Sequence, residues 1–498
     1  MYKRQAIISK NCAHFIMAEL AIWMAGHVTV ALYPTVNAET AKYVIEHSEA
    51  SLVFVGKLDV WDDIKPGVSE DIPHIAFPLA PSGHGYTTWD EVTGKTEPLD
   101  GNPLPDPEAL GILIYTSGST GTPKGVMHAH GRMGAAAEGI VRELEINGDD
   151  RALSYLPLAH VFERAYIEAA SLVAAPHIFF AESLDTFVDD LKRAHPTIFI
   201  SVPRLWLKFQ LGVFQKMPKK KLDLYTKIPI LSGIVKKKVL AGLGLDAVRL
   251  AGSGSAPIPA ELIAWYRSLG LKLMEGYAMS EDFAYSHLST EEHSEPGYVG
   301  VPYPEVSVKI SDEGEILIDS PGKMMGYYKL PELTAESFTE DGFFKTGDRG
   351  ARREPSGLLK ITGRVKEIFK TSKGKYVAPA PIENLLNNDP HIELSCVGGT
   401  GMPQPFAQVV LSEDLRPKMG DAGVKAEVQA ALSELLAEVN KKVEHHEQLQ
   451  FLAIASDEWS IANGMLTPTM KIRRTAIEDA TKDRVEGWYE ESQKVVWA

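Results

Sequence analysis

The stretch Gly111–Val126, GILIYTSGSTGTPKGV, decides how this chain folds around its site. Residues 112–115, ILIY, predict a buried strand that runs without a spacer into Thr, Ser, Gly and one lysine. Glycines let successive backbone N–H groups face one point, while hydroxyls and a lysine add further donors for an anion. The stretch therefore predicts a strand that aims a phosphate-binding loop. The predicted phosphate-binding residues are Thr116, Ser117, Gly118, Ser119, Thr120, Gly121 and Lys124.

The spacing of this loop separates it from the common P-loop. Lys124 follows Pro123 and precedes Gly125, which disfavours the G-x-x-x-x-G-K-[ST] pattern of P-loop NTPases and kinases. Any short piece of the loop also reads as an ordinary polar surface loop. The full string YTSGSTGTPKGV, however, closely resembles the nucleotide-binding signature of the acyl-adenylate-forming enzymes, which include acyl-CoA synthetases, luciferases and adenylation domains. The resemblance implies that the loop binds ATP and that Thr116 also contacts Mg²⁺.

Length, composition and charge set limits on the class of protein. A chain of 498 residues exceeds what one hydrophobic core usually serves, so two or more domains are expected. With 44% apolar and 23% charged residues it has a soluble, globular composition, and its formal charge of −15 argues against a nucleic-acid binder. Two distant cysteines, Cys12 and Cys396, form no metal-ligand pattern or disulfide framework, which favours a reducing cytoplasm.

The first part of the chain predicts an α/β fold. Strands at residues 5–9, 28–33 and 51–56 alternate with helices at Ala13–Ala25 and Ala38–Ser48, a pattern typical of parallel sheets. The resemblance implies a large multi-sheet amino-terminal domain with parallel sheets and a small, mobile α+β carboxy-terminal domain. It also implies that the several dozen residues which usually precede this point in the family are missing here.

Two later strands predict an adenine site. One runs into GSGSAPIP at residues 252–259, whose small residues allow a flat ligand to approach, and LKLMEGYAMSE at 271–281 delivers an aromatic ring, a hydroxyl and a carboxylate. By resemblance, Tyr277 stacks on the adenine, Ser280 lies near the α-phosphate in place of the more usual Thr, and Glu281 ligates Mg²⁺ through the nucleotide. The residues implied to border the adenine are Ser255, Ala256, Pro257, Glu275, Gly276 and Tyr277.

Five residues of the last third have roles that only the resemblance implies. Asp348 in TGD alone reads as a turn residue, and Lys471 in LTPTMKIRR alone reads as surface charge. In the family pattern, Asp348 and Arg364 bind the ribose, Arg364 also contacts phosphate, and Lys471 reaches the site of adenylation. Lys366 falls at the hinge between domains 1–364 and 365–498, and Gly374 lines the approach of the CoA thiol.

Two further features carry open alternatives. His160 in PLAHVFER is either a hydrogen-bonded structural residue or, as the resemblance suggests, part of the acyl pocket. The lysine triplets at 219–221 and 236–238 are either a solvated face or a peripheral contact with an anionic membrane.

The sequence as a whole most resembles long-chain fatty acyl-CoA synthetases, through EIFKTSKGKYVAP and LTPTMKIRR. The resemblance implies an AMP-forming ligase with ATP, Mg²⁺ and coenzyme A, which activates a carboxylic acid, most simply a long-chain fatty acid. Three alternatives stay open at this point. The acceptor could be a carrier-protein thiol, the acid could be aromatic or medium-chain, and the chain could be a truncated or non-catalytic nucleotide or acyl binder.

Overall fold

The computed structural model describes residues 3–117, 122–290, 292–467 and 470–498, and for Ser117 and Ile230 it describes the backbone alone. The chain folds as two compact units, an amino-terminal unit of Met1–Lys309 and Leu317–Lys345 and a carboxy-terminal unit of Ile310–Ile316 and Thr346–Ala498. The predicted boundary at residues 364 and 365 and the hinge at Lys366 stay predictions. Four predicted phosphate-binding residues lie outside the described residues, namely Gly118, Ser119, Thr120 and Gly121.

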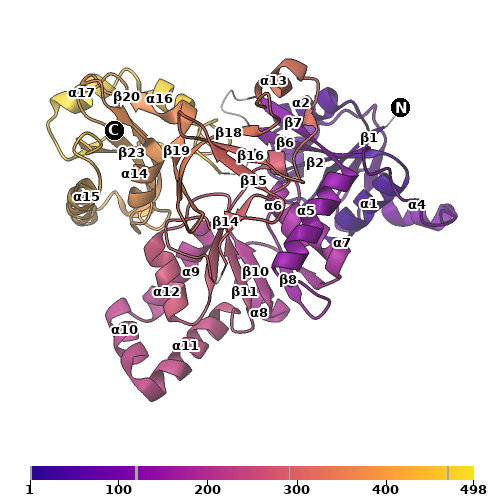
Figure 1. The fold of residues 1–498 in the computed structure, drawn as a ribbon, viewed down its shortest axis with the longest axis horizontal. Coiled ribbons are helices and arrows are strands. Elements are labelled where there is room, and N and C mark those ends of the chain that lie inside the picture. The colour runs from indigo at the N-terminus through magenta and orange to yellow at the C-terminus, as the bar shows by residue number, and fades with distance from the viewer. Residues whose placement is uncertain (1–2, 118–121, 291, 468–469) are drawn as a thin grey trace. The chain divides into compact units, whose positions relative to one another are not determined.

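An eight-stranded sheet, in the order β17-β7-β6-β2-β1-β3-β4-β5, opens the amino-terminal unit (Figure 1). The strands from β6 to β5 run parallel, and β7 and β17 add antiparallel strands at one edge. This arrangement confirms the predicted alternation of strands and helices. The strands are β1 (Arg4–Ile8), β2 (Val28–Leu32), β3 (Ala50–Val55), β4 (His74–Ala76), β5 (Thr87–Thr88), β6 (Leu110–Ser117), β7 (Pro123–Ala129) and β17 (Gly326–Tyr327). The connecting helices are α1 (Ala13–Met24), α2 (Ala38–Ser48), α3 (Trp61–Ile64), η1 (Lys65–Gly67), α4 (Trp89–Lys95) and α5 (His130–Glu143).

A seven-stranded sheet, in the order β14-β13-β12-β11-β10-β8-β9, forms the second half of this unit. Its strands from β9 to β12 are parallel, which brings their carboxyl ends to one edge. The strands are β8 (Arg151–Ser154), β9 (His177–Phe180), β10 (Ile198–Ser201), β11 (Leu250–Ser253), β12 (Leu273–Tyr277), β13 (His287–Leu288) and β14 (Val301–Pro302). The helices are α8 (Phe187–Ala194), α9 (Pro203–Lys216), α10 (Lys219–Lys227), α11 (Pro229–Leu243), α12 (Ala260–Ser268) and η3 (Ser280–Asp282). Helix α13 (Pro331–Glu336) contacts β17 of the eight-stranded sheet.

A segment of three short helical pieces packs in a core shared by both sheets. These pieces are α6 (Val161–Glu163), the π-helical η2 (Arg164–Ala169) and α7 (Ala170–Ala174). Buried Ala165 of η2 belongs to the same apolar cluster as Ile112 of β6 and Ile200 of β10. The segment therefore links the sheet that carries the signature stretch to the sheet that carries the predicted adenine elements.

A buried ionic cluster fixes the other side of this segment. Arg164, only 1% exposed, bonds through Nη1 to the carboxylate of Glu19 on α1 and to Glu168 Oε2 at 2.8 Å. Burial raises the pKa of the Glu168 carboxyl well above its usual range, against the pull of the arginine. One guanidinium thus ties η2 to α1, and its charge offsets part of the cost of burying two carboxyl groups.

The carboxy-terminal unit contains most of the remaining elements. The chain passes between the units within the four-stranded sheet β15-β16-β18-β19, and a second four-stranded sheet, β22-β23-β24-β25, lies in the core of this unit. The predicted amphipathic helix is confirmed as α15 (Ala422–Lys442), with Val428, Leu432, Leu436 and Val439 buried. The strands are β15 (Ser307–Ile310), β16 (Glu315–Asp319), β18 (Phe344–Arg353), β19 (Leu358–Arg364), β20 (Phe369–Lys370), β21 (Tyr376–Val377), β22 (Ile392–Gly398), β23 (Phe406–Leu411), β24 (Leu452–Ile454) and β25 (Val495–Trp497). The other helices are η4 (Val365–Glu367), α14 (Pro379–Leu386), η5 (Arg416–Lys418), α16 (Arg474–Thr481) and α17 (Val485–Glu490).

The ionic cluster yields a stability prediction. Arg164→Met is expected to lower the free energy of unfolding by about 3–5 kcal/mol, because it leaves two carboxyl groups buried without their cation. Urea denaturation followed by circular dichroism measures the change. The matched control, Arg142→Met, removes a 56% exposed side chain with surface ion pairs and should cost less than about 1 kcal/mol. Equal, small losses in both variants would contradict this account of the cluster.

Candidate active site

The signature stretch forms a hairpin rather than a strand followed by a long loop. Strand β6 continues through Thr116 and Ser117, and β7 begins at Pro123, so that Thr116 lies opposite Lys124 in antiparallel register. The expectation that both residues lie in a loop is therefore wrong, because β6 stays paired with β7 through Thr116 and Ser117. The hairpin brings a threonine and a lysine of the signature to one place.

A tyrosine joins two of the predicted site residues. Tyr327 of β17 pairs with β7, and its hydroxyl donates a hydrogen bond of 2.8 Å to Glu281 Oε1. The ammonium of Lys124 lies 5.7 Å from the centre of the same ring, within the range of a cation–π contact. Burial and the adjacent Glu281 carboxylate raise the pKa of Tyr327 above its usual range, so the hydroxyl remains a donor. Glu281 and Lys124 thus both contact one buried tyrosine.

Buried polar groups hold the turn that carries Ser280 and Glu281. His128 Nε2 donates to the Ser280 carbonyl at 2.7 Å, and burial lowers the pKa of His128 to about 4, so the imidazole is neutral near pH 7. Asp282 Oδ1 accepts from the Met279 backbone N–H at 3.0 Å, and burial raises the pKa of Asp282 to about 8. His128 of β7 and the Asp282 carboxyl therefore hold the turn η3 in place.

The two predicted adenine elements are joined by Glu275. This residue is 4% exposed, and its Oε1 accepts a 3.1 Å hydrogen bond from the backbone N–H of Ile258. Burial raises the pKa of the Glu275 carboxyl to about 8. Ser255 has a φ of +67°, a left-handed conformation that turns the Ser255–Pro257 loop beside β12. Pairing of β11 with β12 and this hydrogen bond thus bring the two segments together, as the sequence predicts.

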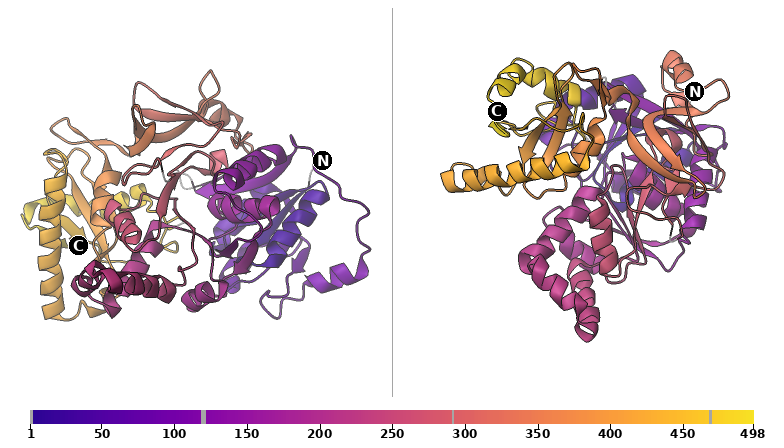
Figure 2. Two further views of the ribbon diagram at one scale, coloured as in Figure 1. Left: turned by 60° about the horizontal axis from the view of Figure 1, so that its bottom comes forward. Right: turned by 60° about the vertical axis from the view of Figure 1, so that its left-hand side comes forward.

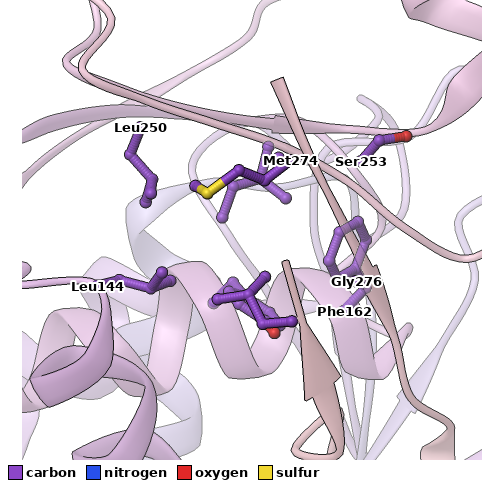
Figure 3. A pocket seen from close by; sticks show the side chains of 10 residues that line it. Leu144, Phe162, Leu250, Ser253, Met274 and Gly276 are labelled. Atoms are coloured by element: carbon purple, nitrogen blue, oxygen red, sulfur yellow. The ribbon is translucent and has the colours of Figure 1, made fainter. Parts of the chain in front are cut away.

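A small cavity of about 20 Å³ lies beside these elements, with a mostly apolar lining (Figure 3). Its walls come from β10, β11, β12 and β13 on one side and from α6 and η2 on the other. Leu144 and Leu250 lie at one end of the group in Figure 3, and Phe162 and Ser253 at the other. Ser253 is the last residue of β11 and precedes the Ser255–Pro257 loop by two positions, so the cavity adjoins the predicted nucleotide elements. The lining residues are Leu144, Phe162, Tyr166, Ile200, Leu250, Gly252, Ser253, Met274, Gly276 and Leu288.

His160 immediately precedes α6, the helix that contributes Phe162 to the lining of this cavity. Its Nδ1 accepts a hydrogen bond of 3.2 Å from the backbone N–H of Phe162 and so caps α6. Glu163 anchors the same turn, since its Oε1 accepts from Ser154 Oγ at 2.6 Å and from Asn11 Nδ2 at 3.2 Å. The structural role weighed for His160 is present, and its contact with the acyl group stays a prediction.

In the carboxy-terminal unit, the structure brings the two predicted ribose residues together. Asp348 of β18 lies opposite Arg364 of β19, and Arg364 Nε lies 3.0 Å from Asp348 Oδ1. The aspartate is 9% exposed, whereas the arginine side chain is 56% exposed. A turn at Gly347 (φ +73°), whose N–H donates to Glu315 Oε1 at 2.8 Å, precedes the aspartate.

The other predicted residues of this unit lie in exposed turns. Lys366 is an exposed residue of η4, and Gly374, with a φ of +76°, closes the turn between β20 and β21. Lys471 is exposed, and its backbone pairs with Thr467 through bonds of 2.8 and 3.1 Å. Three residues later, Arg474 donates a hydrogen bond of 2.7 Å to the Val397 carbonyl and forms an ion pair of 2.8 Å with Glu383. This arginine therefore anchors the chain after Lys471 to the carboxy-terminal unit. The hinge, thiol-channel and adenylation roles of the three residues stay predictions.

The sequence reasoning missed several residues that build the site. Tyr327 was visible only as part of KMMGYY, and its contact with Glu281 depends on a strand pairing that the sequence does not encode locally. Phe162 and Tyr166, which line the cavity, stand four residues apart in VFERAYIEA, a helical spacing that puts both on one face. That spacing was the one available signal for the cavity wall.

Comparison with known proteins identifies the family. Residues 2–328 match the model of the AMP-binding enzyme family, and residues 366–493 match its carboxy-terminal domain model. The chain belongs to the AMP-binding enzyme family. This membership confirms the resemblance predicted from the signature stretch and the predicted class, an AMP-forming acyl-CoA synthetase.

Relatives of this AMP-binding enzyme cover nearly the whole chain. It is 30% identical to Long-chain-fatty-acid–CoA ligase 1 of Homo sapiens over 97% of this chain and 78% of the relative. It is also 30% identical to Long-chain-fatty-acid–CoA ligase FadD15 of Mycobacterium bovis, over 98% of this chain and 88% of the relative.

Solved structures show the same fold. The A domain of carboxylic acid reductase from Segniliparus rugosus, in complex with AMP and a co-purified carboxylic acid, is 24% identical. It superposes with a TM-score of 0.79 over 98% of this chain and 83% of that one. ATP-bound MatB from Rhodopseudomonas palustris is 22% identical, with a TM-score of 0.73 over 97% of this chain and 89% of that one. The predicted fold class is confirmed.

Magnesium is the metal that the family implies, and the donor set of the amino-terminal unit fits it. A carboxylate at Glu281 and a hydroxyl at Thr116 are hard oxygen ligands, which Mg²⁺ prefers alongside waters and substrate phosphates. Within the described ranges, no group of three or more His, Cys, Asp or Glu side chains is arranged for a metal.

Tyr327→Phe tests how Glu281 is positioned. The variant keeps the ring beside Lys124 but removes the hydroxyl that bonds Glu281, so the carboxylate loses its orienting partner. We expect the MgCl₂ concentration for half-maximal pyrophosphate release to rise about tenfold. Tyr328→Phe is the control, because that hydroxyl lies 3.5 Å from exposed Glu49 instead. An unchanged Mg²⁺ requirement in Tyr327→Phe would show that the tyrosine does not orient the ligand.

Proposed function

We propose that this enzyme activates a long-chain fatty acid with Mg·ATP and transfers the acyl group to coenzyme A. The observation that carries the proposal is the apolar cavity at the ends of β11 and β12. The strands that lead into the predicted adenine elements also supply Leu250, Gly252 and Met274 to an apolar wall. The cavity offers about 20 Å³, so an acyl chain would enter by displacing its walls, with its carboxylate toward the nucleotide. The names of the two relatives support a long chain.

The first half-reaction forms an acyl-adenylate. An oxygen of the carboxylate attacks the α-phosphorus of ATP, the bond from that phosphorus to the bridging oxygen breaks, and pyrophosphate leaves. Lys124 of the amino-terminal unit and Lys471 of the carboxy-terminal unit carry the positive charge that stabilises the phosphate oxygens as negative charge develops. Magnesium, when bound, neutralises further charge on the phosphates, and Glu281 and Thr116 are the residues that would hold it. No side chain needs to act as a nucleophile.

The second half-reaction consumes the adenylate. The sulfur of CoA attacks the acyl carbonyl carbon, and AMP leaves with the electron pair of the broken carbon–oxygen bond. Asp348 and Arg364 hold the ribose of the AMP moiety, and the Gly374 turn borders the approach of the thiol. Rotation at Lys366 exchanges the Lys471 segment for the Gly374 turn between the two steps. We place the enzyme in the cytoplasm.

The cavity predicts how chain length is selected. At Gly252, an added Cβ would lie 3.6 Å from Ile200, an ordinary contact, so a Cβ is tolerated there and a larger side chain would take up the little space that the cavity offers. Gly252→Leu is expected to lower the ratio of kcat/KM for palmitate over that for octanoate at least tenfold, because each lost methylene contact costs about 1–3 kcal/mol. Coupled pyrophosphate assays on the two acids measure the ratio. Gly94→Leu, at an exposed position of α4 with open space around it, is the control. A folded Gly252→Leu enzyme with an unchanged ratio would remove the cavity from the acyl site.

Separate assays of the two half-reactions test the proposed alternation. Lys471→Ala should lower adenylate formation by about 100-fold while leaving thioester formation from supplied acyl-adenylate nearly intact, because its charge acts only in the first step. Lys366→Pro should do the reverse, because a fixed φ at the hinge hinders rotation. Pyrophosphate release and thioester formation are measured separately. Equal losses of both half-reactions in either variant would count against alternation.

A further inference from the structure

The helices α9, α10 and α11 concentrate positive charge. Residues 203–243 contain ten lysines and arginines and one acid, Asp223, a formal charge of +9 in a chain whose net charge is −15. The acid is itself paired, since Lys219 Nζ lies 2.7 Å from Asp223 Oδ2. The rest of the chain is therefore strongly acidic, and this segment is its basic pole.

The inner face of the α10–α11 hairpin is already occupied. Leu222 of α10 is 1% exposed, and Val235, Val239 and Leu240 of α11 pack against the same apolar cluster, which includes Trp206 of α9. In Figure 1 and in the right-hand view of Figure 2, both helices extend away from the sheets of the amino-terminal unit. The hairpin is held by one face and presents the other face outward.

The tip of the hairpin exposes three large aliphatic side chains. Leu224 is 58% exposed, Ile228 is 44% exposed and Ile234 is 62% exposed. The turn between the helices lies at Ile228, and no member of the trio is more than six residues from it, about 9 Å along a helix. Isolated aliphatics on a surface are ordinary, but three grouped at a projecting turn make a contact surface.

Exposed lysines stand one helical turn from these aliphatic side chains. Lys220 and Lys227 lie four residues before and three residues after Leu224, and Lys237 and Lys238 lie three and four residues after Ile234. We call these side chains the tip face, which comprises Lys220, Leu224, Lys227, Ile228, Ile234, Lys237 and Lys238.

We propose that the tip face docks the enzyme on an anionic lipid membrane. Lysine ammonium groups bind the lipid phosphates while their long stems stay along the apolar boundary, and the three aliphatic side chains enter the acyl layer. The remainder of the chain has a net negative charge, so electrostatics favours the orientation in which the basic pole faces this surface. Aliphatic tips offer nucleic-acid bases neither hydrogen bonds nor stacking, which favours lipid over a nucleic acid. Docking itself does not depend on the proposed function. Its purpose, the collection of fatty acid dissolved in the membrane, rests on that function.

Within the part of the chain that the structure describes, no helix is long and apolar enough to cross a membrane. The proposed contact is accordingly peripheral and reversible, and it is screened by salt.

Vesicle sedimentation of the full chain tests the proposal. The protein should bind vesicles of phosphatidylcholine with phosphatidylglycerol, bind pure phosphatidylcholine much less, and dissociate as salt is raised. The variant Lys220→Gln, Lys227→Gln, Lys237→Gln, Lys238→Gln should lower the partition coefficient more than a hundredfold, at roughly fivefold for each lysine. The matched control, Lys42→Gln, Lys65→Gln, Lys95→Gln, Lys192→Gln, removes the same charge from exposed positions of the same unit. Equal losses in the two variants, or no binding by the unaltered protein, would overturn the proposal.

A second variant separates insertion from attraction by charge alone. Leu224→Ser with Ile234→Ser should lower the partition coefficient at least tenfold while leaving the salt dependence in place. Unchanged binding would contradict insertion of the aliphatic tip, and binding of a labelled single-stranded oligonucleotide as tight as vesicle binding would overturn the choice of lipid. Pyrophosphate release with octanoate in the absence of vesicles, unchanged in all variants, shows that the fold and the chemistry are intact. Vesicle binding is read without turnover, so its failure is distinct from failure of the proposed function.

Discussion

The parallel pairing of β11 with β12 is the constraint on which the site depends. Parallel strands end at the same edge of a sheet, so the loop after β11 and the turn after β12 emerge side by side. The buried Glu275 carboxyl then joins them through the Ile258 N–H. Because the same two strands also contribute Gly252, Ser253, Met274 and Gly276 to the cavity, the nucleotide elements and the apolar cavity cannot be moved independently. A ligase that joins an apolar acid to a nucleotide needs this fixed relation.

The opposite wall of the cavity is held by buried charge. Phe162 and Tyr166 face the cavity from α6 and η2, while Arg164, on the same segment, bonds Glu19 and Glu168. Burying three ionisable groups costs free energy, and an apolar packing of similar volume would often be at least as stable. The ionic cluster orients η2, because the Arg164 guanidinium is bonded to α1 and so limits rotation of this π-helical segment about its own axis. The shape of the cavity then follows from contacts made on the far side of its wall.

The sequence was sufficient for the fold class and for the motifs, and insufficient for the contacts between them. Lys124 was predicted from a string whose residue types suit phosphate, and Glu281 was predicted from the resemblance of its string to the family pattern. Tyr327, which contacts both, was not predicted, because its bond to Glu281 spans 46 residues and arises from the edge strand β17 pairing with β7. The continuation of β6 through Ser117 was also missed, since a run of Thr, Ser and Gly favours a loop locally and only pairing with β7 extends the strand. Glu275 shows the same limit, because the resemblance placed it beside the adenine, which stays a prediction, but gave no sign of the hydrogen bond that its buried carboxyl accepts from the Ile258 N–H.

The most direct test of the account is pyrophosphate release from ATP and Mg²⁺ with a series of acids from acetate to oleate, with and without CoA, with mass analysis of the products. The account predicts release that peaks with a long-chain acid, and acyl-CoA with AMP formed only when CoA is present. Measurable ATP binding with no pyrophosphate release for any acid would contradict it and would indicate a nucleotide binder that does not form an adenylate.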